Sequence, residues 1–113
     1  MRTRKERFDD IVGDVAEDLD RTLDAHSLVV EFAVLDLPTD LGRDWAPQVP
    51  LARSIPATRN TPARVIVFRR PIEGRATGRS AIADLVRSVL VAEVADLFAV
   101  PREELDRSAD LDD

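Results

Sequence analysis

Two residue types that build many catalytic and metal sites are almost absent from this chain. Its 113 residues contain no cysteine and a single histidine, His26. Without cysteine the chain can form no disulfide bond, no thiolate metal site and no thiol nucleophile. One histidine cannot supply a metal site made of several imidazoles. We therefore expect His26 to be a helix cap or turn residue rather than a metal ligand.

Long apolar runs are missing too. No run in the sequence approaches the ~18 residues that a membrane-spanning helix requires. The first seven residues lead into an amphipathic pattern, not into the apolar segment of a secretory signal. The length is that of one ordinary domain. These features predict a single cytoplasmic domain over residues 1–113, with no membrane partner.

Aromatic residues are few, and the charge is unevenly distributed. The chain has four phenylalanines, one tryptophan and no tyrosine, so a surface for stacking nucleic-acid bases is not expected. The net charge of -6 hides a basic middle, because residues 37–80 hold eight arginines and three acids. We interpret these arginines as partners for the acidic segments on either side. An Arg-rich nucleic-acid-binding domain is the alternative.

The hydrophobic pattern predicts an α+β fold in which an N-terminal helix packs on a small mixed sheet. Apolar residues at helical spacing predict helices, and runs of β-branched residues predict strands. The expected elements are a helix over 3–24, strands over 28–37, 51–55 and 64–70, a helix over 80–98, and a short helix over 101–107. The strand over 28–37 is apolar on both sides and is expected to be central. The acidic tail over 108–113 is expected to fray.

Prolines and one serine indicate where the expected strands end and where the second long helix begins. Five of the seven prolines fall in residues 38–62, an irregular connection in which Trp45 is expected to anchor the chain on the core. Pro71 is expected to end the strand over 64–70, which would place the preceding two arginines on opposite faces. Ser80 is the expected N-cap of the second long helix.

Two carboxylates stand out in the last long helix. At about 100° per residue, Glu93 and Asp96 fall within its apolar stripe and on one side of it. Buried carboxylates are costly without a partner. We therefore predict that Arg53, Arg69 or Arg70 pairs with Glu93 or Asp96, and we treat all five as candidate residues of a cleft or ion-pair cluster.

Two segments of the sequence carry a family resemblance. The run Val-Ala-Glu-Val-Ala-Asp-Leu-Phe-Ala-Val over 91–100 resembles the zinc helix of a small bacterial zincin-like metallopeptidase family, whose motif is H-E-x-x-H-x-x-G-x-x-D. The run Arg-Arg-Pro-Ile-Glu over 69–73 resembles the segment that precedes this helix in the family. Residues 51–57 and 63–68 resemble an actinobacterial branch. The resemblance implies a minimal zincin-like fold.

The same resemblance implies that the zinc ligands are gone. The two histidine positions fall on Ala92 and Asp96, the glycine position on Ala99, and the last acidic ligand position on Arg102. Only the general-base position keeps its residue type, as Glu93. In such motifs two histidines hold zinc while the glutamate acts on its bound water. Catalytic zinc typically takes three protein ligands, so no metal site and no zinc cofactor are expected.

The function expected from this sequence is that of a family member that no longer cleaves peptides. Its former active-site cleft is expected to bind a peptide or protein instead. The alternatives are an active metallopeptidase with a non-standard metal site and the Arg-rich nucleic-acid-binding domain. No G-x-S-x-G, P-loop or G-x-G-x-x-G motif points to another chemistry.

Overall fold

The computed structural model describes residues 3–38 and 49–111, with side chains described up to residue 106. The expected position of Trp45 lies outside the described residues. Within them, the elements in chain order are α1 (Arg4–Ala25), β1 (Val30–Leu35), β2 (Ala52–Ile55), β3 (Ala63–Phe68), α2 (Arg69–Glu73), α3 (Arg79–Phe98) and α4 (Arg102–Leu111). The predicted α+β class is confirmed. No helix in this part of the chain is long and apolar enough to cross a membrane.

The helix α1 begins and ends with well-formed caps. The Thr3 hydroxyl accepts a hydrogen bond from the Glu6 N–H at 3.1 Å, and the Glu6 carboxylate accepts one from the Thr3 N–H at 3.2 Å. This capping box satisfies two N–H groups that the helix leaves unpaired. At the other end His26 is the C-cap, as predicted, and Ser27 has a φ of 57°. The Leu28 N–H donates to the Leu23 carbonyl at 2.8 Å, which closes the last turn.

The sheet is mixed and has the order β1-β3-β2. β1 runs parallel to β3, with Val30 opposite Ala63, and β2 runs antiparallel to β3, with Ala52 opposite Val67. β3 is therefore the central strand, and the prediction that the strand over 28–37 is central is wrong. Its run of β-formers reveals a strand but not the strand's place in the sheet, and Val29 just before it stays 72% exposed.

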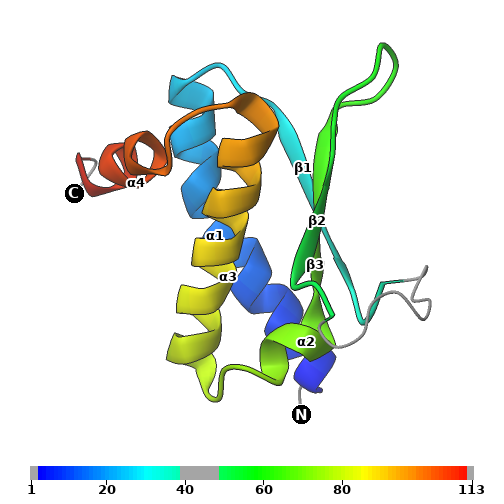
Figure 1. Ribbon diagram of the computed structural model, residues 1–113. Coiled ribbons are helices and arrows are strands. Elements are labelled where there is room, and N and C mark those ends of the chain that lie inside the picture. The colour runs from blue at the N-terminus through cyan, green and yellow to red at the C-terminus, as the bar shows by residue number, and fades with distance from the viewer. Residues whose placement is uncertain (1–2, 39–48, 112–113) are drawn as a thin grey trace.

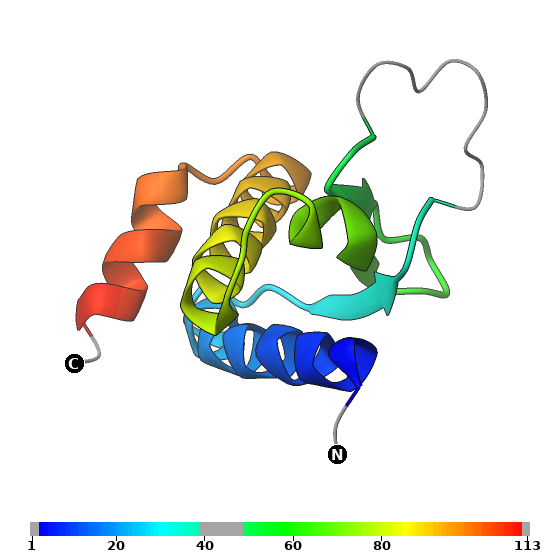
Figure 2. The ribbon, with the colours of Figure 1, turned by 90° about the horizontal axis from the view of Figure 1, so that it is seen from below.

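The two long helices cover one face of the sheet (Figures 1 and 2). α1 packs against β1, α3 packs against β2 and β3, and the two helices also contact each other. The core between these layers combines buried side chains of α1, β3 and α3, among them Phe8, Leu19, Val65, Val67, Val86, Leu90 and Val94. α4 packs on α1 and α3 away from the sheet, with Leu105 fully buried. It is longer than the helix expected over 101–107, and fraying of 108–113 stays a prediction.

The segment between β3 and α3 differs from the sequence prediction. The strand ends at Phe68, and Arg69 and Arg70 start the helix α2 instead of extending the strand. Pro71 lies in the first turn of α2, where a proline is tolerated because the N–H groups there have no helical partner. Ser80 is not the N-cap of α3. Gly78 is, with a φ of 89° and no side-chain capping bond.

Candidate functional site

Glu93 lies in the C-terminal half of α3, beside the strand β2. Its side chain is half-buried, and a hydrogen bond from the Ser54 side chain of β2 reaches it. Burial raises the pKa of the Glu93 carboxyl, the Ser54 hydrogen bond opposes this rise, and the nearby charge of Asp96 adds to it. The position that resembles the family's general base thus holds a carboxylate whose charged form is disfavoured.

Asp96 is exposed, so the prediction that both carboxylates lie within the apolar stripe is wrong for this residue. The buried face of α3 is formed by Val86, Leu90, Val91, Val94 and Ala95. This face is rotated away from the stripe chosen from the sequence, because apolar residues lie almost all round α3. In such a helix the apolar pattern does not determine which side faces the sheet. Glu93 ends up at the border of the buried face and Asp96 beyond it.

The remaining positions of the resembling motif supply no set of metal ligands. Ala92 is half-buried and carries only a methyl group, while Arg102, the first residue of α4, is exposed and cationic. Among residues 3–38 and 49–106 there is no group of three or more His, Cys, Asp or Glu side chains placed to hold a metal ion. Zinc, which takes imidazole, thiolate or carboxylate ligands, does not fit this donor set.

Ala99, at the position that resembles the family's glycine, has a left-handed backbone. It follows the last residue of α3 with φ 54° and ψ 41°, a left-handed conformation that glycine adopts freely and alanine does not. The Val100 N–H donates to the Ala95 carbonyl at 3.1 Å and closes the helix around this residue. This helix end therefore has a conformation that glycine would adopt at lower cost than the alanine present.

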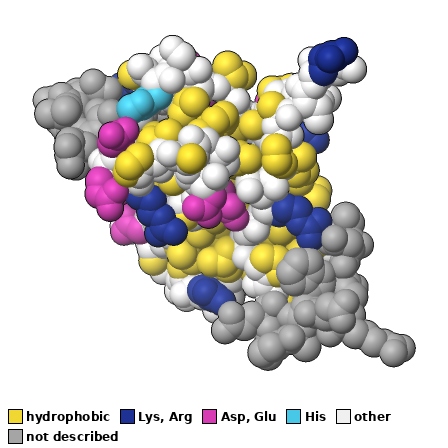
Figure 3. Space-filling model, turned by 45° about the horizontal axis from the view of Figure 1, so that its top comes forward, with side chains coloured by type: hydrophobic (Ala, Val, Ile, Leu, Met, Phe, Trp, Pro, Cys, Tyr) yellow, Lys and Arg dark blue, Asp and Glu magenta, His cyan; other side chains and the backbone are white. Residues whose placement is uncertain are grey.

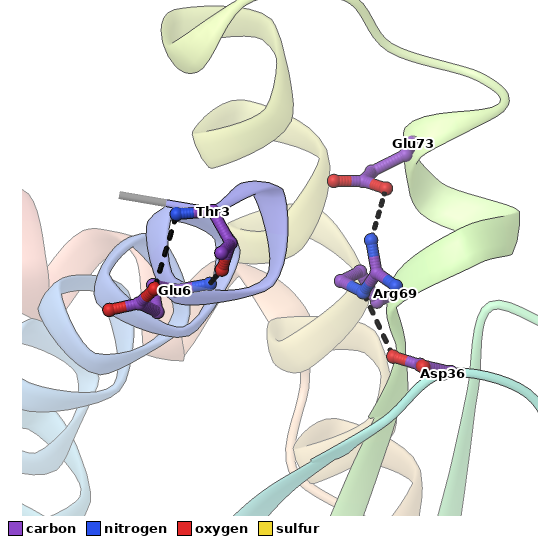
Figure 4. A network of polar contacts seen from close by, with 5 residues as sticks. All are labelled: Thr3, Glu6, Asp36, Arg69 and Glu73. Carbon is purple, nitrogen blue, oxygen red and sulfur yellow. Dashed lines mark hydrogen bonds and ion pairs between the residues drawn. The ribbon is translucent and has the colours of Figure 1, made fainter. Parts of the chain in front are cut away.

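The predicted ion pairs between arginine and the α3 carboxylates are not formed by Arg69. Its Nε donates to Asp36 Oδ1 at 2.9 Å and its Nη1 to Glu73 Oε1 at 2.9 Å (Figure 4). The Arg69 side chain is 11% exposed, so the guanidinium is held between the chain after β1 and the end of α2. Arg70 is exposed, and Arg53 lies on the face of β2 opposite Ser54, since side chains alternate along a strand.

Sequence reasoning missed the Arg69 cluster. A hydrogen bond from Arg69 is the main reason that the pKa of Asp36 is lowered, and the same bond raises the pKa of Arg69. The four-residue spacing of Arg69 and Glu73 is a helical ion-pair signal, but it could be recognised only if the segment is seen as a helix. Nothing in the local sequence points to Asp36, which comes from another strand end.

Other arginines of the basic middle also pair within the molecule. Arg64 of β3 contacts Glu31 of β1 at 3.3 Å, and Arg79 contacts Asp14 of α1 at 3.0 Å. Internal pairing is thus confirmed for these two and for Arg69. On the face seen in Figure 3, Lys and Arg side chains are scattered among acidic and apolar ones and form no continuous basic patch. This face therefore offers no continuous basic surface for a nucleic-acid backbone.

Comparison with known protein families places this fold among described ones. A family model described as a zincin-like metallopeptidase matches residues 27–110. The matched range begins just after α1 and runs through the sheet, α2, α3 and most of α4. No curated protein was found to match the chain.

Proposed function

Since the chain belongs to the zincin-like metallopeptidase family, we propose that it keeps the frame of that family without the zinc chemistry and acts by binding, not by cleaving, a peptide or protein. We also assign it to the actinobacterial branch that its sequence resembles, and to the cytoplasm. The proposal rests on one observation. The side chains at the resembling ligand positions are a methyl group at Ala92, an exposed carboxylate at Asp96 and a guanidinium at Arg102.

The chemistry of hydrolysis explains why this observation matters. In an H-E-x-x-H helix the metal lowers the pKa of a bound water, and the glutamate takes a proton from it. A glutamate without that metal faces ordinary water, which is a poor nucleophile. Glu93 has a partner for its carboxylate in Ser54, and its raised pKa reflects burial, which is a feature of position in the fold. We therefore treat Glu93 as the remnant of a general base.

The edge of β2 is the proposed binding surface. Within the described residues β2 has a strand neighbour on one side only, β3, so its other edge can accept an extended chain. Ser54 places this edge beside Glu93, and Ile55 is 40% exposed at the end of the strand. An extended peptide here would add backbone hydrogen bonds to the sheet and pass the former catalytic position.

The first experiment measures metal and activity together. The purified full chain, incubated with zinc and freed of excess metal, is expected to retain zinc well below one ion per chain and to cleave no peptide in a mixed library. A Glu93→Gln variant is the matched control and is expected to behave like the unchanged chain. One tightly held zinc per chain, with peptide cleavage that disappears in Glu93→Gln, would show instead an active peptidase with a non-standard site.

The second experiment tests whether the backbone still places the three motif positions where they could hold zinc together. Ala92→His combined with Asp96→His restores the two histidine positions, and Arg102→Asp restores the acidic one. We expect the double variant to gain zinc affinity and the triple variant to bind more tightly still, measured by competition with a chromogenic chelator. The control places histidines at the exposed positions Asp84 and Ser88, where adding Arg102→Asp should change nothing. A triple variant no tighter than the double would contradict a preserved three-ligand frame.

A further inference from the structure

A cavity lies at the other end of α3, far along the helix from Glu93. It has a volume of about 580 Å³ and opens between the start of α1, the segment after α2 and the first turn of α3. This volume falls in the range of cavities that take small organic ligands. The site proposed above uses the C-terminal half of α3, so the cavity has no part in it.

The floor of the cavity is apolar. Phe8 and Ile11 of α1, which are 1% and 4% exposed, line it together with Ile82 of α3 and Ala76. Ile82 is only half-buried, so the first turn of α3 offers part of its apolar surface to this space. A hydrocarbon chain or ring placed here would lose contact with water, which favours binding in proportion to the apolar area covered.

Three arginines surround this apolar floor. Arg4 and Arg7 come from α1 and Arg79 from the start of α3. Within the described residues the side chains of Arg4 and Arg7 make no hydrogen bond or ion pair, and Arg79 makes an exposed contact with Asp14. The one acid in the lining, Glu73, is already engaged by Arg69 at 2.9 Å. Arg4 and Arg7 therefore place positive charge that no described side chain pairs with beside this apolar surface, and Arg79 adds a guanidinium whose exposed partner is Asp14.

The position of Arg4 and Arg7 is not explained by helix stability. Both lie in the first turns of α1, where the helix macrodipole is positive and cations are unfavourable. The capping box of Thr3 and Glu6 accounts for the start of the helix without them (Figure 4). Guanidinium groups bind carboxylates and phosphates through paired hydrogen bonds. At the mouth of the cavity these side chains could therefore bind an anionic group.

We propose that this cavity binds a small amphipathic anion, an apolar chain or ring with a carboxylate or phosphate headgroup. The tail lies on Phe8, Ile11 and Ile82, and the headgroup lies among Arg4, Arg7 and Arg79. The site does not depend on whether zinc binds at the other end of α3, so each proposal can fail without the other.

Calorimetric titration of the full chain tests the site. The probes are octanoate, octyl phosphate, octanol, which lacks the charge, and acetate, which lacks the tail. We expect saturable binding of octanoate, octyl phosphate or both, at least about tenfold tighter than either control and weaker at high salt. Binding of only one of the two anions identifies the headgroup. If neither binds more tightly than octanol, the proposal is wrong.

Substitution locates the binding. The double variant Arg4→Gln with Arg7→Gln is expected to weaken octanoate binding by about tenfold, because two charge-assisted contacts are lost. Arg59→Gln, at an exposed arginine in the connection between β2 and β3, is the matched control and should leave the affinity unchanged. Thermal unfolding of both variants verifies folding. An unchanged affinity in the folded double variant would overturn the proposal, as would an equal loss in the control.

Discussion

Arg69 and Glu93 are both partly shielded from solvent, but the charges around them differ. Opposite charges surround Arg69, whereas a like charge lies near Glu93. Arg69, on α2, sits between two carboxylates at 2.9 Å each. Glu93, on α3, has a neutral Ser54 as hydrogen-bond partner and the like charge of Asp96 nearby, and its charged form is disfavoured. Both lie in segments that resemble family motifs. The comparison separates a charge that is held by opposite charges from one that burial and a like charge disfavour.

The two segments also differ in what their residues do for the fold. The Arg-Arg-Pro-Ile-Glu segment forms a helix whose first residue ties it to the chain after β1, which positions the connection leading to α3. The segment around Glu93, which resembles the family's zinc helix, ends at the left-handed Ala99, and its proposed task is binding without zinc. The predictions that follow test this contrast.

The largest effect is expected for Arg69→Met. Methionine keeps much of the aliphatic bulk but leaves Asp36 and Glu73 without their shared cation. Breaking a well-buried pair costs about 3–5 kcal/mol, and since Asp36 is half exposed we expect about 2 kcal/mol here. Urea unfolding measures the loss. Arg70→Met, at the exposed neighbour, is the control and should change the free energy of unfolding little. Equal effects would mean that the pairing of Arg69 is unimportant.

A smaller, stabilising effect is expected for Ala99→Gly. The left-handed backbone costs alanine about 1–2 kcal/mol, and glycine's greater freedom when unfolded offsets part of the gain. We expect the free energy of unfolding to rise by about 0.5–1 kcal/mol. Ala95→Gly is the control, because within the helix the same change should destabilise. If Ala99→Gly destabilises as much as Ala95→Gly, the helix end does not have the conformation described.

Glu93→Gln should stabilise slightly at neutral pH. Burial and Asp96 disfavour the charge, and glutamine can still accept the Ser54 hydrogen bond. Because the side chain reaches solvent, we expect a gain on the order of 0.5 kcal/mol. Asp96→Asn, which removes the like charge from an exposed position, is expected to do less. Destabilisation by Glu93→Gln at pH 7 would indicate a cationic partner for Glu93 and reverse the contrast with Arg69.

The smallest expected effect is on the pH dependence of the free energy of unfolding. The pKa of Glu93 is raised, so its contribution is present below the ordinary value of 4.5 and is lost as pH rises through the folded value. The pKa of Asp36 is lowered, so its contribution is present above the ordinary value of 3.8 and is lost as pH falls through the folded value. The free energies of unfolding of Glu93→Gln and Asp36→Asn across pH 2–7 should therefore approach that of the unchanged chain at the acidic end. Toward neutral pH they should diverge from it with opposite signs, Glu93→Gln to higher and Asp36→Asn to lower stability. The same sign for both would contradict the contrast.

The parts of the fold that the sequence predicts are those with a single strong period or cap. α1 has one apolar face, so its buried side was predictable, and His26 follows from the helix stop. α3 has apolar residues nearly all round, so its orientation depends on the sheet, and the pattern predicts the wrong side for Asp96. The run 28–37 predicts a strand, but its position at the edge depends on β3, which comes later in the chain.

The residues of the candidate sites can likewise be predicted only where they lie close together in the sequence. Glu93 and the positions that resemble the family motif can be located from the sequence, because they lie within about ten consecutive residues at the spacing of that motif. The partner of Arg69 cannot be located in this way, because Asp36 lies 33 residues earlier and meets Arg69 only after β1 and β3 have paired. The cavity beside Arg4, Arg7 and Arg79 is likewise built from the start of α1 and of α3, with no shared local pattern.

The order of the strands has a consequence for how the chain folds. β2 and β3 form a hairpin across a short connection, whereas β1 reaches β3 only by closing a long loop, with Glu31 and Arg64 33 residues apart. Closing a longer loop costs more chain entropy, and parallel pairing is the slower kind. We expect the hairpin to be formed in the transition state for folding and β1 to join afterwards, so that substitutions in β1 mainly speed unfolding and those in β3 mainly slow folding.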